Sequence, residues 1–88
     1  MPNHNESAKA SQDIIYKFIK LAMKERGISQ KKLSEIIEVN ESTLIRNFKN
    51  ETEMSVTTLL KICGALKIRP YIVPAELDDT EMKHIFFN

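Results

Sequence analysis

Three residues separate two short amphipathic segments in the middle of the chain, at 29–37 and 41–49. Each segment begins at a residue type that caps helix N-termini, Ser29 in the first and Asn40 in the second. Apolar residues then recur about one turn apart: Leu33, Ile36 and Ile37 in the first segment, Leu44 and Phe48 in the second. A three-residue connection is too short to reverse the chain. We therefore expect two short helices that meet near a right angle.

A longer helix is predicted on each side of this pair. The first spans 11–26, from a cap at Ser11 to Gly27, which supplies the left-handed position after a helix end. Its predicted apolar face is Ile14, Phe18, Leu21 and Ala22, with Ile15 and Ile19 beside it. The second spans 55–67 and is capped by Ser55. Its apolar residues are Val56, Leu59, Leu60, Ile62, Cys63 and Leu66. The predicted fold is an all-α domain of four or five helices.

The pattern divides the chain into three parts. Residues 1–10 lack apolar periodicity and are predicted to be a flexible arm, with an added turn of the first helix as the alternative. Residues 11–68 form the helical domain, and 69–88 form a C-terminal extension. The extension contains two strand-like, apolar stretches, which we expect to hold a homodimer together because a small monomer rarely leaves such residues exposed. These residues are Tyr71, Ile72, Val73, Ile85, Phe86 and Phe87. The alternative is that they fold back on their own helices.

Composition argues against several classes of protein. The 88 residues contain no apolar run long enough to cross a membrane, and the polar N-terminus does not resemble a secretory signal. Cys63 is the only cysteine, which suits a reducing compartment, so we expect a cytoplasmic protein. Neither His4 nor His84 has neighbours at metal-ligand spacing, and no glycine-rich loop could hold a phosphate. We expect no enzymatic activity, metal or cofactor.

The two halves of the chain differ in charge. Through Asn50 there are nine Lys/Arg against six Asp/Glu, a net charge of +3, and from Glu51 there are four against six, a net charge of −2. A basic front and an acidic tail suit nucleic acid at one end and a protein contact at the other, although the imbalance is small.

The outward side of the predicted helix at 41–49 carries the residues best suited to read DNA. They are Glu41, Ser42, Thr43, Ile45, Arg46 and Lys49, which are mostly hydrogen-bonding or cationic. A helix that projects from a small core can enter the major groove, which is about 12 Å wide. The alternative is an ordinary solvated face, in which Glu41 only complements the helix dipole.

From Gly27 to Ile68 the chain resembles the repressor-type helix-turn-helix family that contains the lambda and 434 repressors and Cro. Four stretches carry the resemblance: Gly27-Ile28-Ser29-Gln30 with Leu33-Ser34-Glu35, then Val39-Asn40-Glu41-Ser42-Thr43-Leu44, then Ser55 to Ile62, and Ala65-Leu66-Lys67-Ile68. Three residues depart from the family pattern. Ser34 replaces a small Ala, Glu38 stands where the turn usually has Gly, and Asn50 stands where Gly commonly ends the third helix.

The resemblance implies a role for each matched position. Gln30 matches a glutamine that touches a phosphate and braces the recognition helix. Glu41 and Ser42 match the first base-reading positions, and Ile45 and Arg46 the next turn. Thr43 and Lys49 match backbone-contacting positions. Lys31 lies beside Gln30 on the helix that crosses the DNA backbone, where a phosphate contact and a solvated position are equally open.

These features predict a sequence-specific regulator of transcription, a repressor, that binds duplex DNA as a homodimer on a palindromic operator. The alternative is an interaction module of the antitoxin type, whose acidic and apolar tail binds a partner protein. RNA binding is less favoured because the chain shows no aromatic platform for stacked bases.

Overall fold

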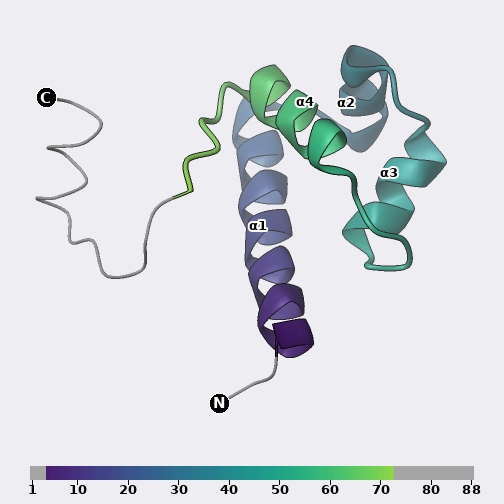
Figure 1. The fold of residues 1–88 in the computed structure, drawn as a ribbon. Coiled ribbons are helices and arrows are strands. Elements are labelled where there is room, and N and C mark those ends of the chain that lie inside the picture. Colours follow the sequence, from purple (N-terminus) through teal and green to yellow (C-terminus); the bar gives the residue numbers. More distant parts are fainter. Residues whose placement is uncertain (1–3, 73–88) are drawn as a thin grey trace, which may run out of the picture.

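The computed structural model describes residues 4–72, and these form four helices and no strand (Figure 1). The helices are α1 (His4–Arg26), α2 (Gln30–Ile37), α3 (Glu41–Phe48) and α4 (Val56–Leu66). The all-α class is confirmed, and the last three helices begin and end within one residue of the predicted bounds. Tyr71 and Ile72 are not part of a strand, whereas Val73, Ile85, Phe86 and Phe87 lie outside the described residues.

Local chemistry sets most of these boundaries. The Ser29 hydroxyl accepts a hydrogen bond from the Lys32 backbone N–H at 3.0 Å, and Ser55 accepts one from Thr58 at 3.0 Å, as capping residues do. Asn40 is the N-cap residue of α3, as predicted, but its side chain makes no capping hydrogen bond. Gly27 ends α1 in the left-handed conformation at φ +66°, where a side chain would be strained.

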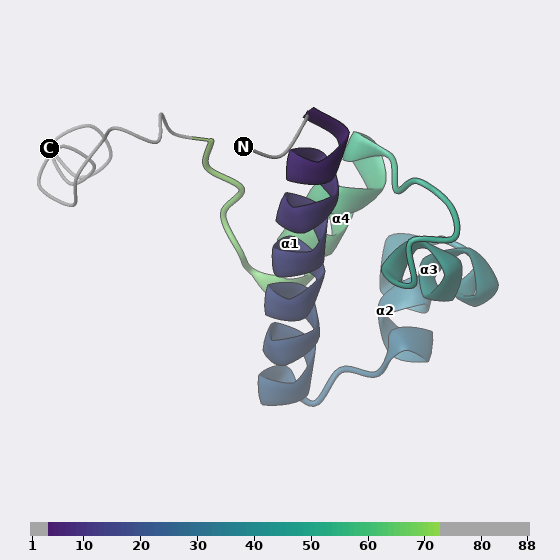
Figure 2. The ribbon, with the colours of Figure 1, turned by 90° about the horizontal axis from the view of Figure 1, so that it is seen from below.

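α4 lies between α1 and α2 in the two perpendicular views, and α3 packs against α2 (Figures 1 and 2). The core is closed by residues from all four helices. These are Tyr16, Ile19, Ala22 and Met23 of α1, Leu33 and Ile37 of α2, Leu44 and Phe48 of α3, and Ile62 and Leu66 of α4. Cys63 is also buried, which raises the pKa of its thiol.

The predicted apolar face of α1 is wrong at its centre: Ala22 and the flanking Ile19 are buried, but the other predicted residues are exposed. Of its central residues only Ala22 is buried, while Ile14, Phe18 and Leu21 expose 69%, 56% and 54% of their surface. The buried side of the helix is a second apolar stripe, Tyr16, Ile19 and Met23. The Tyr16 ring packs edge-on against Phe48 of α3, with centroids 5.5 Å apart. Both stripes have helical spacing, so the shape of the partner surface decides which one is buried.

Three further residues predicted to face inward are exposed: Ile36 of α2 and Val56 and Leu60 of α4. Each helix places only one side against the core, and the neighbours of these residues fill it. Leu33 and Ile37 occupy the space on α2, and Ile62 and Leu66 occupy it on α4.

The predicted flexible arm is wrong for residues 4–10, which form the first two turns of α1 rather than preceding a cap at Ser11. Ala8, Lys9 and Ala10 favour helix, and no Gly or Pro interrupts residues 4–26. Further along α1, the Asp13 carboxylate accepts a 2.8 Å hydrogen bond from the Asn50 side chain beyond α3. This hydrogen bond joins α1 to the residue two positions beyond the end of α3.

Candidate nucleic-acid interface

The turn between α2 and α3 fixes how α3 stands on the domain. Glu38 ends α2 in the left-handed conformation, at φ 57° and ψ 46°. The backbone N–H groups of Glu38 and Val39 both donate hydrogen bonds to the Ser34 carbonyl, the one from Val39 at 3.0 Å. These bonds satisfy the end of α2 as a left-handed cap does, although Glu38 carries a side chain where Gly would fit without strain. Glu38 thus adopts the left-handed conformation at the position where the family pattern has Gly.

The other two departures from the family pattern are accommodated. Ser34 is buried, and its hydroxyl donates to the Lys31 carbonyl at 2.6 Å, so the extra polar group is satisfied. Asn50 adopts φ 61°, which asparagine tolerates better than most residues, and its amide donates to Asp13.

α3 buries one side and leaves the other accessible. Leu44, Asn47 and Phe48 are buried. All six residues predicted to face outward remain accessible: Ser42, Arg46 and Lys49 are exposed, and Glu41, Thr43 and Ile45 are half-buried. Arg46 lies along its own helix, where its Nε donates to the Ser42 carbonyl at 3.3 Å. The structure thus brings these six side chains together on one exposed helix side.

Gln30 and Lys31 occupy the first turn of α2. Gln30 is half-buried and Lys31 is exposed, and within residues 4–72 neither side chain makes a hydrogen bond or an ion pair. Both are therefore available to a ligand that approaches the first turn of α2.

The connection from α3 to α4 folds back beside α3, which the sequence did not predict. The buried Asn47 amide donates to the Thr52 hydroxyl at 2.9 Å, and the Glu51 N–H donates to the Arg46 carbonyl at 3.0 Å. A polar cleft of about 360 Å³ results, with α3 on one side and the start of α4 on the other. Its lining residues are Thr43, Arg46, Asn47, Thr52, Glu53, Ser55 and Thr58.

Three residues of that cleft, Thr52, Ser55 and Thr58, join the accessible polar surface of α3 although they were not among the predicted site residues. Ser55 both caps α4 and donates to the Thr58 hydroxyl at 2.9 Å. Of these three residues, only Ser55 was recognisable from the sequence, as a helix cap. The fold of the loop depends on the buried side chain of Asn47, so local sequence did not indicate it.

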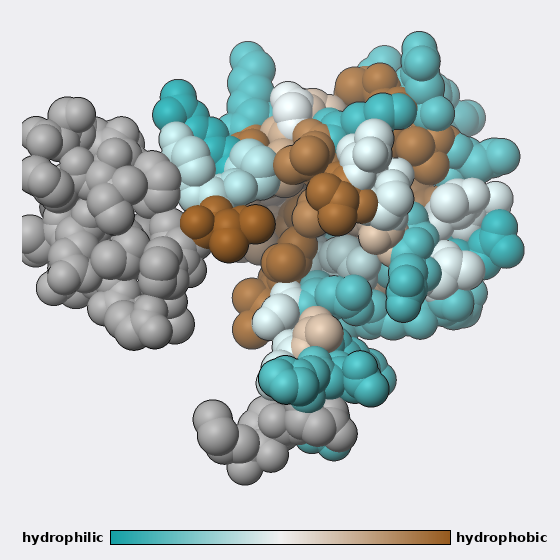
Figure 3. Space-filling view, viewed as in Figure 1, coloured by the Kyte–Doolittle hydropathy of each residue, from teal (hydrophilic) through white to brown (hydrophobic). Residues whose placement is uncertain are grey.

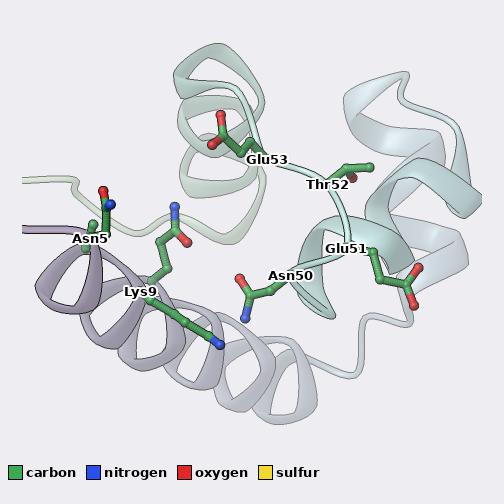
Figure 4. Close-up of a pocket in the computed structure, with 8 residues that line it drawn as sticks. Asn5, Lys9, Asn50, Glu51, Thr52 and Glu53 are labelled. Atoms are coloured by element: carbon green, nitrogen blue, oxygen red, sulfur yellow. The ribbon is translucent and has the colours of Figure 1, made fainter.

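A second polar cleft, of about 400 Å³, lies between the start of α1 and the loop after α3 (Figure 4). Lys9 of α1 shares it with Glu51 and Glu53, although Glu51 points away from α1. Two Glu and one Lys line the cleft, so its net charge does not favour a phosphate. We therefore read this cleft as part of the contact that supports α3, rather than as a DNA-binding surface.

The model of the Cro/C1-type HTH DNA-binding domain matches residues 19–71, more than half of the chain. The chain belongs to this family. No curated protein and no solved structure matches it.

Membership of the Cro/C1-type family makes DNA the partner, and the match spans the whole of α2, α3 and α4. The match begins within α1 at Ile19, so the first turns of that helix lie outside it. Two observations concern other classes of site. No group of His, Cys, Asp and Glu within residues 4–72 is arranged to hold a metal ion. None of the described helices is both long enough and apolar enough to cross a membrane.

Proposed function

We propose that this Cro/C1-type protein is a sequence-specific repressor of transcription that places α3 in the major groove of its operator. The observation that supports this most directly is the division of α3 into a buried side and an accessible polar side. Ser42 and Arg46 offer donors and an acceptor to base edges, and Lys49 offers a charge to the phosphate backbone. A protein that fills the groove at a promoter excludes others from it, which is why we favour repression. Such a protein acts in the cytoplasm, where the DNA is.

We assign the contacts as the family resemblance implies. Glu41, Ser42, Ile45 and Arg46 read bases, while Gln30, Lys31, Thr43 and Lys49 contact the backbone. We further propose a homodimer on a palindromic site, because one short helix reads few base pairs and a two-fold copy about 34 Å away doubles the sequence that is read. Residues 69–88 are the proposed means of pairing. Tyr71 and Ile72, the apolar residues of this extension that the structure describes, expose 49% and 97% of their surface.

Arg46 provides the sharpest test. After the operator is selected from a random duplex pool, Arg46→Ala should weaken binding by about 1–3 kcal/mol, or roughly 5- to 150-fold, and relax preference at one base pair. Arg26→Ala is a matched control. Arg26 also donates to the carbonyl four residues earlier, at 3.2 Å, but it lies on α1. It should bind like the unaltered protein.

Gln30→Ala should weaken all sequences alike, because a phosphate contact carries no sequence information. Affinity should also fall steeply with salt as counterions are released. Both are measured by fluorescence anisotropy of labelled duplexes. Salt-independent binding, or no binding to any duplex, would contradict the proposal and favour the alternative of an interaction module of the antitoxin type.

A further inference from the structure

α1 and α4 share an apolar face that the core does not use. Ile14, Phe18 and Leu21 lie one turn apart on α1 and are all more than half exposed. On α4, Val56 and Leu60 are also one turn apart, and they expose 72% and 49% of their surface. Figure 3 shows hydrophobic side chains gathered over α1 and α4 on the side turned to the viewer. We refer to these five residues, together with the 40% exposed Ile15, as the α1–α4 face.

The α1–α4 face is too large to be ordinary surface. Its six side chains together expose on the order of 700 Å², more than the few hundred Å² that monomers usually leave in one apolar patch. A stable protein–protein interface needs about 800 Å² from each partner, so this area is close to one half of such an interface. The face is therefore suited to a partner.

The charge of the two helices favours an acidic partner. α1 and α4 carry six Lys/Arg against three Asp/Glu, a net charge of +3. Two copies of the face placed against each other would bring like charges together. Residues 73–88 carry four Asp/Glu against one Lys, a net charge of −3, and they include the apolar side chains expected to pack on such a face. These are Val73, Leu77, Met82, Ile85, Phe86 and Phe87.

The course of the chain after α4 indicates which copy supplies this segment. Residues 68–72 leave the end of α4 and move off to the side of α1 in both views (Figures 1 and 2). Ile72 at the end of this stretch is 97% exposed, so the chain has already left its own surface. The sixteen residues that follow can span about 50 Å when extended, whereas Ile14 and Leu21 are only about 11 Å apart along α1. The segment is long enough to cross the face of a neighbour.

We propose that the α1–α4 face is the docking site for residues 73–88 of the second copy of this chain, so that the two copies exchange their C-terminal segments. This inference rests on the proposed homodimer and gives it a receptor surface. The apolar side chains of the segment cover the face, and its carboxylates lie against the lysines that border the face on α1 and α4. The exchange leaves α3 of each copy free for DNA.

The test uses two variants of the full chain with complementary defects, measured without DNA by sedimentation equilibrium. Ile14→Asp damages the face, and Phe86→Asp damages the segment. Each alone should raise the dimer dissociation constant at least tenfold. Their equimolar mixture should regain dimer, because the intact segment of one variant meets the intact face of the other. Val56→Asp replaces Ile14→Asp if circular dichroism shows that the latter has lost helix.

Ile36→Asp is the matched control, because Ile36 is also an exposed isoleucine but lies on α2. It should remain as dimeric as the unaltered chain. A dimer that persists in Ile14→Asp and Val56→Asp would overturn the proposal, as would two monomeric variants whose mixture stays monomeric. A monomeric unaltered chain, with the segment on its own face, would also overturn it. Since no DNA is present, none of these results bears on DNA binding by α3, which Arg46→Ala tests separately.

Discussion

Replacing Glu38 by glycine should stabilise the domain. Glu38 adopts φ 57° and ψ 46° at the turn between α2 and α3. A residue with a Cβ costs about 1–2 kcal/mol in the left-handed helical region, and glycine avoids that cost. Glycine also has more freedom in the unfolded chain, which offsets about 0.5–1 kcal/mol of the gain. The net expectation for Glu38→Gly is a gain of about 0.5–1 kcal/mol in the free energy of unfolding.

Nothing else in the turn should oppose this gain. The Glu38 side chain is exposed and makes no hydrogen bond or ion pair within residues 4–72, and the backbone bonds to the Ser34 carbonyl do not depend on it. A gain of about 1 kcal/mol raises the melting temperature of a domain of this size by about 4–8 °C. Thermal and urea unfolding, followed by circular dichroism at 222 nm, measure the change.

Glu38→Ala separates the backbone effect from the charge. Alanine keeps the Cβ and removes the carboxylate, so its stability should stay close to that of the unaltered chain. Equal stabilisation by alanine and glycine would show that the carboxylate, not the left-handed backbone, is the cause. No stabilisation by glycine would refute the claim that strain is stored at this turn. Lys67, at φ 58° after α4, offers the same comparison at a position remote from the turn.

Two further substitutions test the interior. Asn47→Ala should lower the free energy of unfolding by about 1–3 kcal/mol and loosen the loop beside α3, because it removes a buried amide and its 2.9 Å hydrogen bond to Thr52. Chemical denaturation measures the first effect, and amide exchange at residues 50–55 measures the second. Burial, and secondarily the nearby Asp13 carboxylate, raises the pKa of the Tyr16 hydroxyl above its usual value of about 10. The unfolded chain then ionises first, so Tyr16 contributes stability below pH 10 that is lost as the pH rises through the folded-state pKa. Tyr16→Phe should therefore lose less stability than the unaltered chain between pH 9 and 11, and parallel urea titrations that show equal losses would contradict this.

The sequence predicted the helix-turn-helix because the signals there are local. Ser29 is a cap that acts within one turn, and the helices on either side of the turn are only eight residues long. Their inward residues Leu33 and Leu44 are fully buried, as their spacing required. The accessible residues of α3 follow from the same spacing, since they occupy the positions that the buried ones leave. The polar loop at 50–55 could not be predicted in this way, because its fold depends on a buried side chain of α3.

Helical periodicity alone cannot predict which side of α1 is buried. Both the stripe at Ile14 and Phe18 and the stripe at Ile19 and Met23 have helical spacing, and only the surface of the other helices selects between them. If the outer side of α1 only faced solvent, we would expect polar residues there, because exposing the stripe at Ile14 and Phe18 to water is unfavourable. The core covers one of these two apolar sides, and the proposed docking of the segment from a second copy would cover the other. The acidic and apolar residues 73–88 are complementary to the second side in charge and hydrophobicity. The side of α1 on which the sequence prediction failed is thus the side on which the proposed exchange of C-terminal segments would place a second copy.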